Sequence, residues 1–301
     1  MANLLYDLIS MPELPEVETV VEGLKEYLIK HRIQAVDIKS PRSFSLSKLQ
    51  MEKFVIGAEI IGLQRLGKVI CIDLDSRYSL TIHLKMTGQL IYQQIVKGQE
   101  KRRFGAGHPT DSFIGSLPDK TTRAIFQLSD NGWLFFNDMR KFGWIRLIPT
   151  AGLDQETYIQ TLGVDAMTIS SDQFVKLFSR PQRSIKACLL DQTLMAGCGN
   201  IYADESLWKS QISPLIPAHL LTKKQLKQLH QALLDVLTLS IKQGGSSSRN
   251  YVNAKGEKGK YLDFAYVYQR TGQPCRRCQT EIKRIVVVGR GTHICPVCQR
   301  C

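Results

Sequence analysis

The spacing of apolar residues predicts an amphipathic helix near the start of the chain. Between residues 13 and 30, apolar side chains recur every three or four positions, and Pro15 falls in the expected first turn. A helix with one apolar stripe has to bury it, so we expect this helix to pack against a sheet. The apolar positions are Leu14, Val17, Val20, Val21, Leu24 and Leu28.

Short apolar or alternating segments follow this helix, separated by Gly, Asp, Asn and Ser. Such a pattern is typical of the strands of a β-sandwich or barrel. The segments are 59–66, 68–74, 79–84, 90–95, 124–128, 133–137 and 143–148. Residues 96–120 differ, because they are polar, basic and rich in Gly and Pro, which predicts a long, exposed and mobile loop.

Beyond residue 149 the apolar spacing becomes helical, which predicts a second, all-helical domain. The expected helices are 173–178, 184–190, 201–210 and 222–243, and Pro214 and Pro217 break the helical pattern. A run rich in Gly and Ser, GGSSSRNYVNAKGEKGKY, then predicts a flexible loop before the last segment.

Four cysteines near the end of the chain have the spacing of a zinc site. Cys275 and Cys278 form one C-x2-C pair, and Cys295 and Cys298 form a second. Two such pairs joined by a hairpin can place four thiolates tetrahedrally around a structural zinc ion. Two disulfides are the rival interpretation, but the chain shows no export signal. Between the pairs we expect two strands with a Gly-Arg-Gly turn, at which Arg290 could approach a phosphate.

The charge balance favours a polyanionic partner. The 301 residues include 40 Lys and Arg against 27 Asp and Glu, a net charge of +13. Binding to phosphates would release counterions, although a basic solvated surface is the plainer interpretation. No run of about 18 apolar residues occurs, and residues 1–10 do not have the pattern of a signal peptide. We therefore expect neither a membrane span nor secretion.

Two motifs carry candidate chemistry. Gly197 and Gly199 precede a helix expected to begin near Asn200, which could hold a phosphate or form only a turn between packed helices. A proline at a chain start offers a secondary amine that can attack a sugar C1′, expel a base and form an iminium ion. Pro12 and Glu13 could fill these roles of nucleophile and proton shuttle, or form only an acidic helix start.

Three fragments at strand ends mix basic and apolar residues: 65–68, 83–88 and 138–143. Met and Phe in such turns are more often core residues. Interleaved with basic side chains, they are also expected in a wedge that unstacks a duplex while its neighbours hold phosphates. Both interpretations stay open at this point.

Together these motifs resemble the formamidopyrimidine-DNA glycosylases, also called 8-oxoguanine DNA glycosylase/AP lyases. The resemblance runs from Met11 to about Arg300, with the motifs in the family's order: MPELPEVE, RLGK, HLKMTG, DMRKFG, LLDQTLMAGCGNIYADE, GGSSSRNYVN and the cysteine pairs with GRGTHICPVCQR. It implies a multidomain α+β fold: an N-terminal β-sandwich with flanking helices, a helix–two-turn–helix domain and a C-terminal zinc finger.

The expected boundaries follow from this organisation. Residues 1–11 would be an extension absent from the mature protein, and 12–149 the catalytic β-sandwich domain. Residues 150–245 would form the helix–two-turn–helix domain, 246–264 a lesion-capping loop and linker, and 265–301 the zinc finger.

The resemblance implies four catalytic roles. Pro12 would be the Schiff-base nucleophile and Glu13 the proton donor. Lys68 would bind a phosphate and assist β-elimination, and Arg290 would be associated with δ-elimination.

The resemblance also implies DNA contacts. Met86, Arg140 and Phe142 match the triad that fills the gap left by a flipped base, and Arg140 would face the estranged cytosine. The residues expected along the DNA backbone are His83, Lys186 and Asn200. Thr121 stands where many members of the family carry a histidine, so one contact could be lost or replaced by Arg123.

The implied function is base-excision repair of double-stranded DNA by a bifunctional glycosylase and AP lyase that removes oxidised purines and cuts by β,δ-elimination. One structural Zn2+, a monomeric state and a cytoplasmic, nucleoid-associated location are expected with it. An endonuclease VIII-type enzyme for oxidised pyrimidines and a catalytically silent DNA-binding homologue are the alternatives.

The expected mechanism sets a condition on the chain start. Pro12 follows Met11 in the sequence, and a proline nitrogen inside a peptide bond is not nucleophilic. We therefore expect translation to start at Met11, and removal of this methionine to free the amine of Pro12.

Overall fold

The chain divides into two units, residues 1–160 with 244–259 and residues 161–243 with 260–301. The computed structural model describes residues 12–44, 46–107, 111–113, 115–246 and 260–300. The expected extension of residues 1–11 and most of the expected capping loop, residues 247–259, lie outside these ranges. The domain boundaries expected from the sequence stay predictions.

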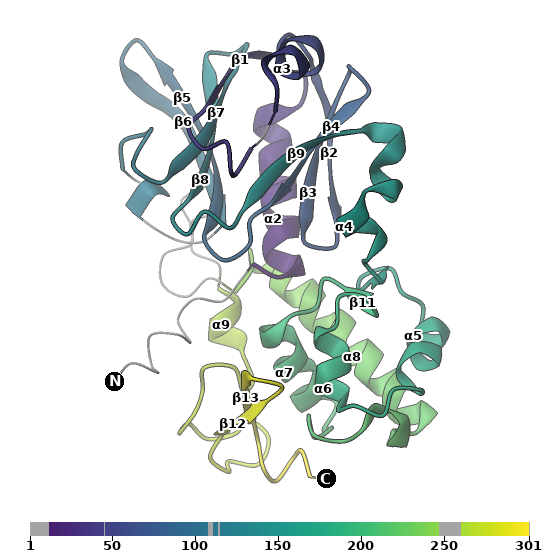
Figure 1. Ribbon diagram of the computed structural model, residues 1–301. Helices are drawn as coiled ribbons and strands as arrows, with labels where there is room; N and C mark the ends of the chain where they lie inside the picture. The colour runs from purple at the N-terminus through teal and green to yellow at the C-terminus, as the bar shows by residue number, and fades with distance from the viewer. Residues whose placement is uncertain (1–11, 45, 108–110, 114, 247–259, 301) are drawn as a thin grey trace. The chain divides into compact units, whose positions relative to one another are not determined.

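The first unit is a sandwich of two antiparallel sheets (Figure 1), which confirms the expected β-sandwich. The strand orders are β1-β7-β8-β5-β6 and β2-β3-β4-β9. The strands are β1 Ile33–Ile38, β2 Ile60–Leu66, β3 Val69–Leu74, β4 Tyr78–His83, β5 Gly88–Val96, β6 Gln99–Gly107, β7 Thr122–Leu128, β8 Gly132–Asp138 and β9 Trp144–Pro149. The facing sides of the sheets share one apolar core, to which Ile72, Leu90 and Phe136 belong.

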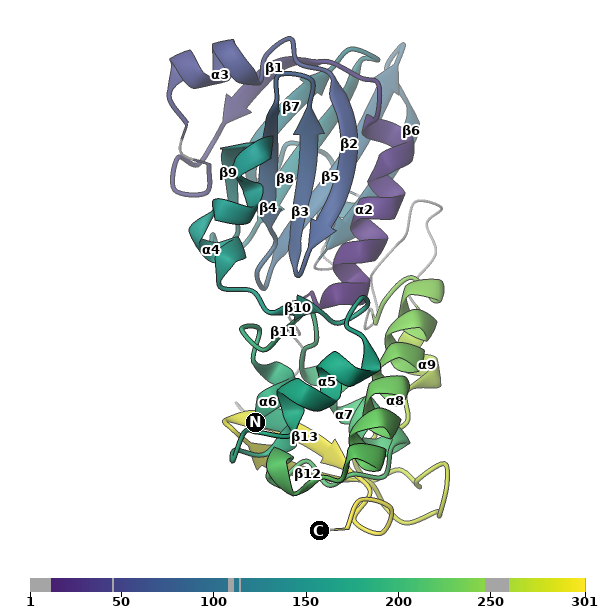
Figure 2. The ribbon, with the colours of Figure 1, turned by 90° about the vertical axis from the view of Figure 1, so that its right-hand side faces the viewer.

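Helix α2, Leu14–Leu28, lies along one open edge of this sandwich, beside β2 of one sheet and β6 of the other (Figure 2). The six apolar side chains expected to face a sheet are at most 1% exposed. Burying each of them contributes about 1.5–3 kcal/mol. The remaining short helices of this unit are α3 Lys48–Phe54, η1 Asp111–Phe113, η2 Thr150–Gln155 and α4 Thr157–Gln160.

The expectation of one long loop over residues 96–120 is wrong, because strand β6 occupies part of it. β6 pairs with β5 from Val96 opposite Gln99 to Gln89 opposite Gly107. Residues 99–102 are exposed, whereas Phe104 is buried and stacks on Tyr27 of α2. A sheet edge tolerates charged residues, so the polarity of this segment hid the strand.

The second unit contains the four expected helices and a short pair of strands. The helices are α5 Ser171–Phe178, α6 Ile185–Leu190, α7 Asn200–Lys209, η3 Ala218–Leu220, α8 Lys223–Lys242 and α9 Tyr261–Phe264. The expectation of an all-helical domain is wrong in one detail, because β10 Val164–Asp165 and β11 Met195–Ala196 pair in parallel. Among the described residues, no helix is both long and apolar enough to cross a membrane.

The cysteine-rich segment holds a hairpin of β12, Lys283–Val287, and β13, Arg290–Ile294. Val287 pairs with Arg290, so the turn is Val288-Gly289 and not the expected Gly-Arg-Gly. Val288 has φ +47 and Gly289 has φ +70. Positive φ at both central residues is the type I′ geometry that suits the twist of a hairpin. A valine is unfavourable in this conformation, which is why the sequence pattern pointed elsewhere.

Gly23 provides a stability test of the contact between α2 and β6. A Cβ on Gly23 would lie 2.3 Å from Cζ of Phe104, whose ring is buried. We expect Gly23→Ala to destabilise the protein by about 1–3 kcal/mol in urea unfolding, although alanine normally favours a helix. Gly152→Ala is the control, because its Cβ would meet nothing within 4 Å. Equal stability of the two variants would show that Phe104 moves aside without cost.

Candidate functional site

Pro12 and Glu13 lie directly before α2, and both are buried. Glu16 fixes the backbone beside them, since its Oε2 accepts a hydrogen bond from the amide of Glu13 at 2.9 Å. Its other oxygen, Oε1, accepts one from the amide of Ser246 at 2.7 Å. One carboxylate therefore holds both the start of α2 and the first residue of the expected capping loop.

Lys68 is the second residue of the tight turn Gly67-Lys68 between β2 and β3 and is 5% exposed. Gly67 in this turn has φ +58, a conformation that favours glycine. Arg65 donates to the carbonyl of Gly67 at 2.9 Å and forms an ion pair with Glu18 of α2. The turn that carries Lys68 is thus tied to the first turns of the helix that Pro12 precedes.

The structure brings Met86, Arg140 and Phe142 together at the surface. Nη1 of Arg140 lies 3.2 Å from Sδ of Met86, and the guanidinium carbon lies 4.8 Å from the ring centroid of Phe142. Phe142 and the neighbouring Met139 are each 53% exposed. Phe142 is therefore not a core residue, and Met139 is an exposed apolar side chain that the sequence reasoning missed.

A buried carboxylate organises the turns that carry these residues. Oδ1 of Asp138 accepts hydrogen bonds from the Thr87 hydroxyl and from the amide of Arg140, and Oδ2 accepts one from the amide of Gly143 at 2.7 Å. The turns after β4 and β8 therefore share one anchor. Sequence reasoning did not single out Asp138, although an Asp at the start of a turn is a recognisable signal.

His83, at the end of β4, is neutral. Its Nδ1 accepts a hydrogen bond from the amide of Lys85 at 3.0 Å, and its Nε2 lies 3.2 Å from the Tyr158 hydroxyl. Burial, together with the charges of Lys85 and Lys68, lowers the pKa of His83 to about 3. His83 therefore carries no charge for a phosphate at neutral pH.

Lys85 is the cation next to His83. It adopts φ +52 and places its ammonium 5.5 Å from the ring centroid of Tyr158. The side chain of Lys85 is half-buried, and the residue immediately precedes Met86 in the sequence. Sequence reasoning missed Lys85 as a site residue, although it lies within the quoted motif HLKMTG.

In the second unit, Asn200 and Lys186 contact the hairpin that carries Arg290. Asn200 opens α7, and its Nδ2 donates to the carbonyl of Gly291 at 2.9 Å. Lys186 is fully buried, and its ammonium lies 2.6 Å from Oγ1 of Thr292. Arg290 itself is exposed at the first position of β13.

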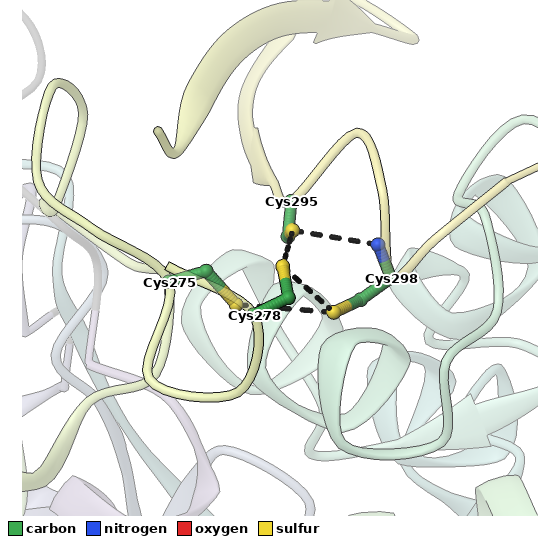
Figure 3. Close-up of side chains that lie close together, drawn as sticks. All are labelled: Cys275, Cys278, Cys295 and Cys298. Atoms are coloured by element: carbon green, nitrogen blue, oxygen red, sulfur yellow. Dashed lines mark hydrogen bonds between the residues drawn. The ribbon is translucent and has the colours of Figure 1, made fainter. Parts of the chain in front are cut away.

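Figure 3 shows the four cysteine side chains turned toward one another. Their sulfurs all lie within 4.8 Å of one another, with 3.9 Å between Cys275 and Cys298 and 3.4 Å between Cys278 and Cys295. A tetrahedral zinc ion with bonds of about 2.3 Å to sulfur requires separations of about 3.8 Å. All four are free cysteines, so the disulfide interpretation is not supported, and the donor set fits zinc.

Neighbouring groups favour the thiolates of Cys275 and Cys278, whereas burial raises the pKa values of Cys295 and Cys298. Nε1 of Trp208 and the amide of Arg277 each lie 3.4 Å from Sγ of Cys275. Hydrogen bonds with Thr280 lower the pKa of Cys278 to about 6. Four thiolates leave no open position, so the site is suited to a structural metal.

Comparisons with known proteins match all three parts of this architecture. The family model "Formamidopyrimidine-DNA glycosylase N-terminal domain" matches residues 11–145, and "Formamidopyrimidine-DNA glycosylase H2TH domain" matches 162–252. "Zinc finger found in FPG and IleRS" matches 272–300. H2TH stands for helix–two-turn–helix.

Curated and solved relatives agree with these matches. Proteins of Pelotomaculum thermopropionicum and Streptococcus pneumoniae, each named formamidopyrimidine-DNA glycosylase, are 37% and 36% identical over 96% of this chain and 99% of their own length. A solved complex of Lactococcus lactis Fpg with DNA that contains an abasic site is 32% identical, with a TM-score of 0.82, and covers 96% of this chain and 100% of that one.

A glycosylase β-sandwich, a helix–two-turn–helix domain and a zinc finger in one chain define a DNA glycosylase of the helix–two-turn–helix class. The chain belongs to the formamidopyrimidine-DNA glycosylase family. The family and the three-part fold expected from the motifs are confirmed.

Replacing one zinc ligand tests the metal site. We expect purified Cys278→Ser to lose its zinc and to melt at a lower temperature, because metal binding contributes folding free energy. Elemental analysis of the protein measures the zinc, and Cys71→Ala, which removes a thiol from strand β3, should retain it. An unchanged zinc content in Cys278→Ser would refute its assignment as a ligand.

Proposed function

We propose that this protein is a bifunctional base-excision repair enzyme that removes oxidised purines from double-stranded DNA and cuts the resulting abasic site. Membership of the family supports this function, and related solved structures are described as Fpg bound to abasic-site and Fapy-dG DNA. The observation that carries the proposal is the buried Pro12-Glu13 pair directly before α2, in the same unit as the surface cluster of Met86, Arg140 and Phe142.

Pro12 would supply the nucleophile. Its amine attacks C1′ of the damaged nucleotide and the bond to the base breaks. The proline nitrogen then loses its proton, the bond between C1′ and O4′ breaks, and the ring-opened sugar is joined to proline through an iminium ion at C1′. This iminium makes a C2′ proton acidic, and loss of that proton expels the 3′ phosphate. A second elimination expels the 5′ phosphate. The chemistry requires a chain that begins at Pro12.

Three further residues would assist these steps. Glu13, buried next to Pro12, would transfer protons to the departing base and the opening sugar. Lys68, at the turn tied to α2, would hold a phosphate during the first elimination. Arg290, exposed on the hairpin, would hold a phosphate with its guanidinium during the second.

The triad of Met86, Arg140 and Phe142 would fill the space that a flipped base leaves. Met86 and Phe142 provide apolar surface for the neighbouring bases, and Arg140 provides hydrogen-bond donors for the estranged cytosine. Extruding a base costs a few kcal/mol, which wedge insertion and phosphate contacts offset. Lys85, next to Met86, and the amino end of α7 at Asn200 are suited to such phosphate contacts. His83, being neutral, would orient Lys85.

The zinc finger would hold one structural zinc ion through Cys275, Cys278, Cys295 and Cys298. The metal would stabilise the hairpin that presents Arg290, and the residues of the chain would carry out the chemistry. The protein would act as a monomer. A cytoplasmic, nucleoid-associated location would give it access to chromosomal DNA.

Borohydride trapping tests the nucleophile. An abasic duplex and borohydride should give a covalent adduct with a chain that begins at Pro12, because the iminium is reduced to a stable amine. The chain that begins at Met1 should give none, since its Pro12 nitrogen is an amide. Denaturing gels and mass spectrometry of the linked peptide measure the adduct. Equal adduct from both forms would assign the nucleophile to an amine other than that of Pro12, such as a lysine.

Lesion preference separates the proposed enzyme from the endonuclease VIII-type alternative. We expect faster release of 8-oxoguanine opposite cytosine than of thymine glycol, because Arg140 can bond to the estranged cytosine. Single-turnover rates on matched duplexes measure both, with undamaged duplex as the control. The reverse order would favour the alternative, and release of neither lesion would favour a silent DNA-binding homologue.

A further inference from the structure

Lys186 is buried in the second unit, although the family resemblance suggested a DNA contact. It is 0% exposed, and its ammonium lies 2.5 Å from Oδ1 of Asp204 and 2.6 Å from Oγ1 of Thr292. Burying an ammonium is unfavourable unless it is paired and hydrogen-bonded, and this one is both. To reach a phosphate, Lys186 would have to leave these partners.

The interactions of Lys186 continue to the backbone of Arg290. The hydroxyl of Thr292 accepts a hydrogen bond from Lys186 and donates one to the carbonyl of Arg290 at 3.1 Å. Thr292 is itself 0% exposed. An unbroken buried chain of contacts therefore runs from Asp204 of α7, through Lys186 of α6, to the exposed arginine.

Helix α7 also binds the next residues of the same strand. Oδ2 of Asp204 accepts a hydrogen bond from the amide of His293 at 2.8 Å. Asn200, four residues earlier and hence on the same helix face, donates to the carbonyl of Gly291 at 2.9 Å. The strand is therefore fixed at three consecutive positions, and Arg290 is the residue just before them.

The adjacent Glu205 fixes the segment that leads into the zinc finger. Its carboxylate is fully buried and accepts hydrogen bonds from the amides of Tyr266, Val267 and Tyr268 at 2.7, 2.9 and 2.8 Å. Two neighbouring carboxylates of α7 thus hold the zinc-finger region at two separate places. Neither contact involves a zinc ligand.

We propose that Asp204, Lys186 and Thr292 are positioning residues for Arg290, which set where the hairpin presents its guanidinium during the second elimination. This inference rests on the proposed role of Arg290. It also assigns Lys186 a contact with the zinc-finger strand in place of a contact with DNA.

Thr292→Val tests the chain of contacts without removing a charge. Valine keeps the shape of threonine but ends the contacts of Lys186 and Arg290 with the hydroxyl, whereas Thr292→Ser keeps them. We expect Thr292→Val to retain zinc and to form the borohydride adduct within about twofold of the original rate. On an abasic duplex, its ratio of 3′-phosphate to 3′-unsaturated-aldehyde ends should fall by about fivefold to tenfold. Thr292→Ser should restore the ratio to within about twofold.

Amide hydrogen exchange of the free protein provides a readout that does not depend on catalysis. Residues 286–294 should exchange about tenfold faster in Thr292→Val and at the original rate in Thr292→Ser. Unchanged exchange would overturn the proposal. It would also be overturned by a normal product ratio in Thr292→Val, or by loss of zinc and of adduct formation together.

Arg290→Ala separates a failure of this inference from a failure of the proposed function. If that variant keeps the original product ratio, the proposed role of Arg290 in the second elimination is wrong. The positioning role of Asp204, Lys186 and Thr292 is then wrong as well. If Arg290→Ala lowers the ratio and Thr292→Val does not, only the positioning role is wrong.

Discussion

Burial of one face of helix α2 is the interaction on which the site in the first unit depends. The helix covers the sandwich edge between β2 and β6, and its apolar stripe is almost completely removed from water. The buried stripe fixes how the helix is rotated about its axis and where it lies along the sandwich edge. It therefore also fixes where Pro12 and Glu13 lie. The turn with Lys68 is then attached to the same helix through the pair of Arg65 and Glu18. Packing along the sandwich edge therefore sets the geometry of the proposed catalytic residues.

Buried carboxylates connect the functional segments of this basic protein. Glu16 joins the start of α2 to Ser246, Asp138 joins two turns, and Asp204 joins α7 to the hairpin. Burial raises the pKa of Glu205, and hydrogen bonds from three backbone amides oppose this rise. In these places the acids serve internal structure, while cations such as Arg140 and Arg290 stay exposed, as their proposed contacts with bases or phosphates require.

The sequence predicted the parts of the fold that follow a strong periodicity. The stripe of α2, the strands from β2 to β5 and the cysteine spacing all depend on local patterns, and the structure has them close to the expected residues. Strand β6 was missed because its polar residues lie on an exposed edge, where pairing with β5 decides the conformation. The turn of the zinc-finger hairpin was misplaced because the pairing of Val287 with Arg290 outweighs the local preference of Val288.

The sequence grouped the candidate site residues but did not show the environment of each side chain. Met86, Arg140 and Phe142 are close in space, as their shared resemblance to a wedge suggests. No local pattern shows that His83 is buried against Tyr158 and neutral, since the two residues are 75 positions apart in the sequence. The burial of Lys186 likewise depends on Thr292, far away in the sequence. Long-range contacts of this kind decide whether a basic residue faces DNA or the protein interior.

The attachment of the hairpin to α7 has a consequence for the zinc finger as an evolutionary module. Small zinc-binding folds are often regarded as portable, because the metal supplies much of their folding free energy. Here strand β13 and residues 266–268 are also bound by Asp204 and Glu205 of another element. A copy of this finger moved into another protein would keep its four thiolates but lose the surface that orients its arginine. The finger and helix α7 should therefore be inherited, exchanged and redesigned as one piece.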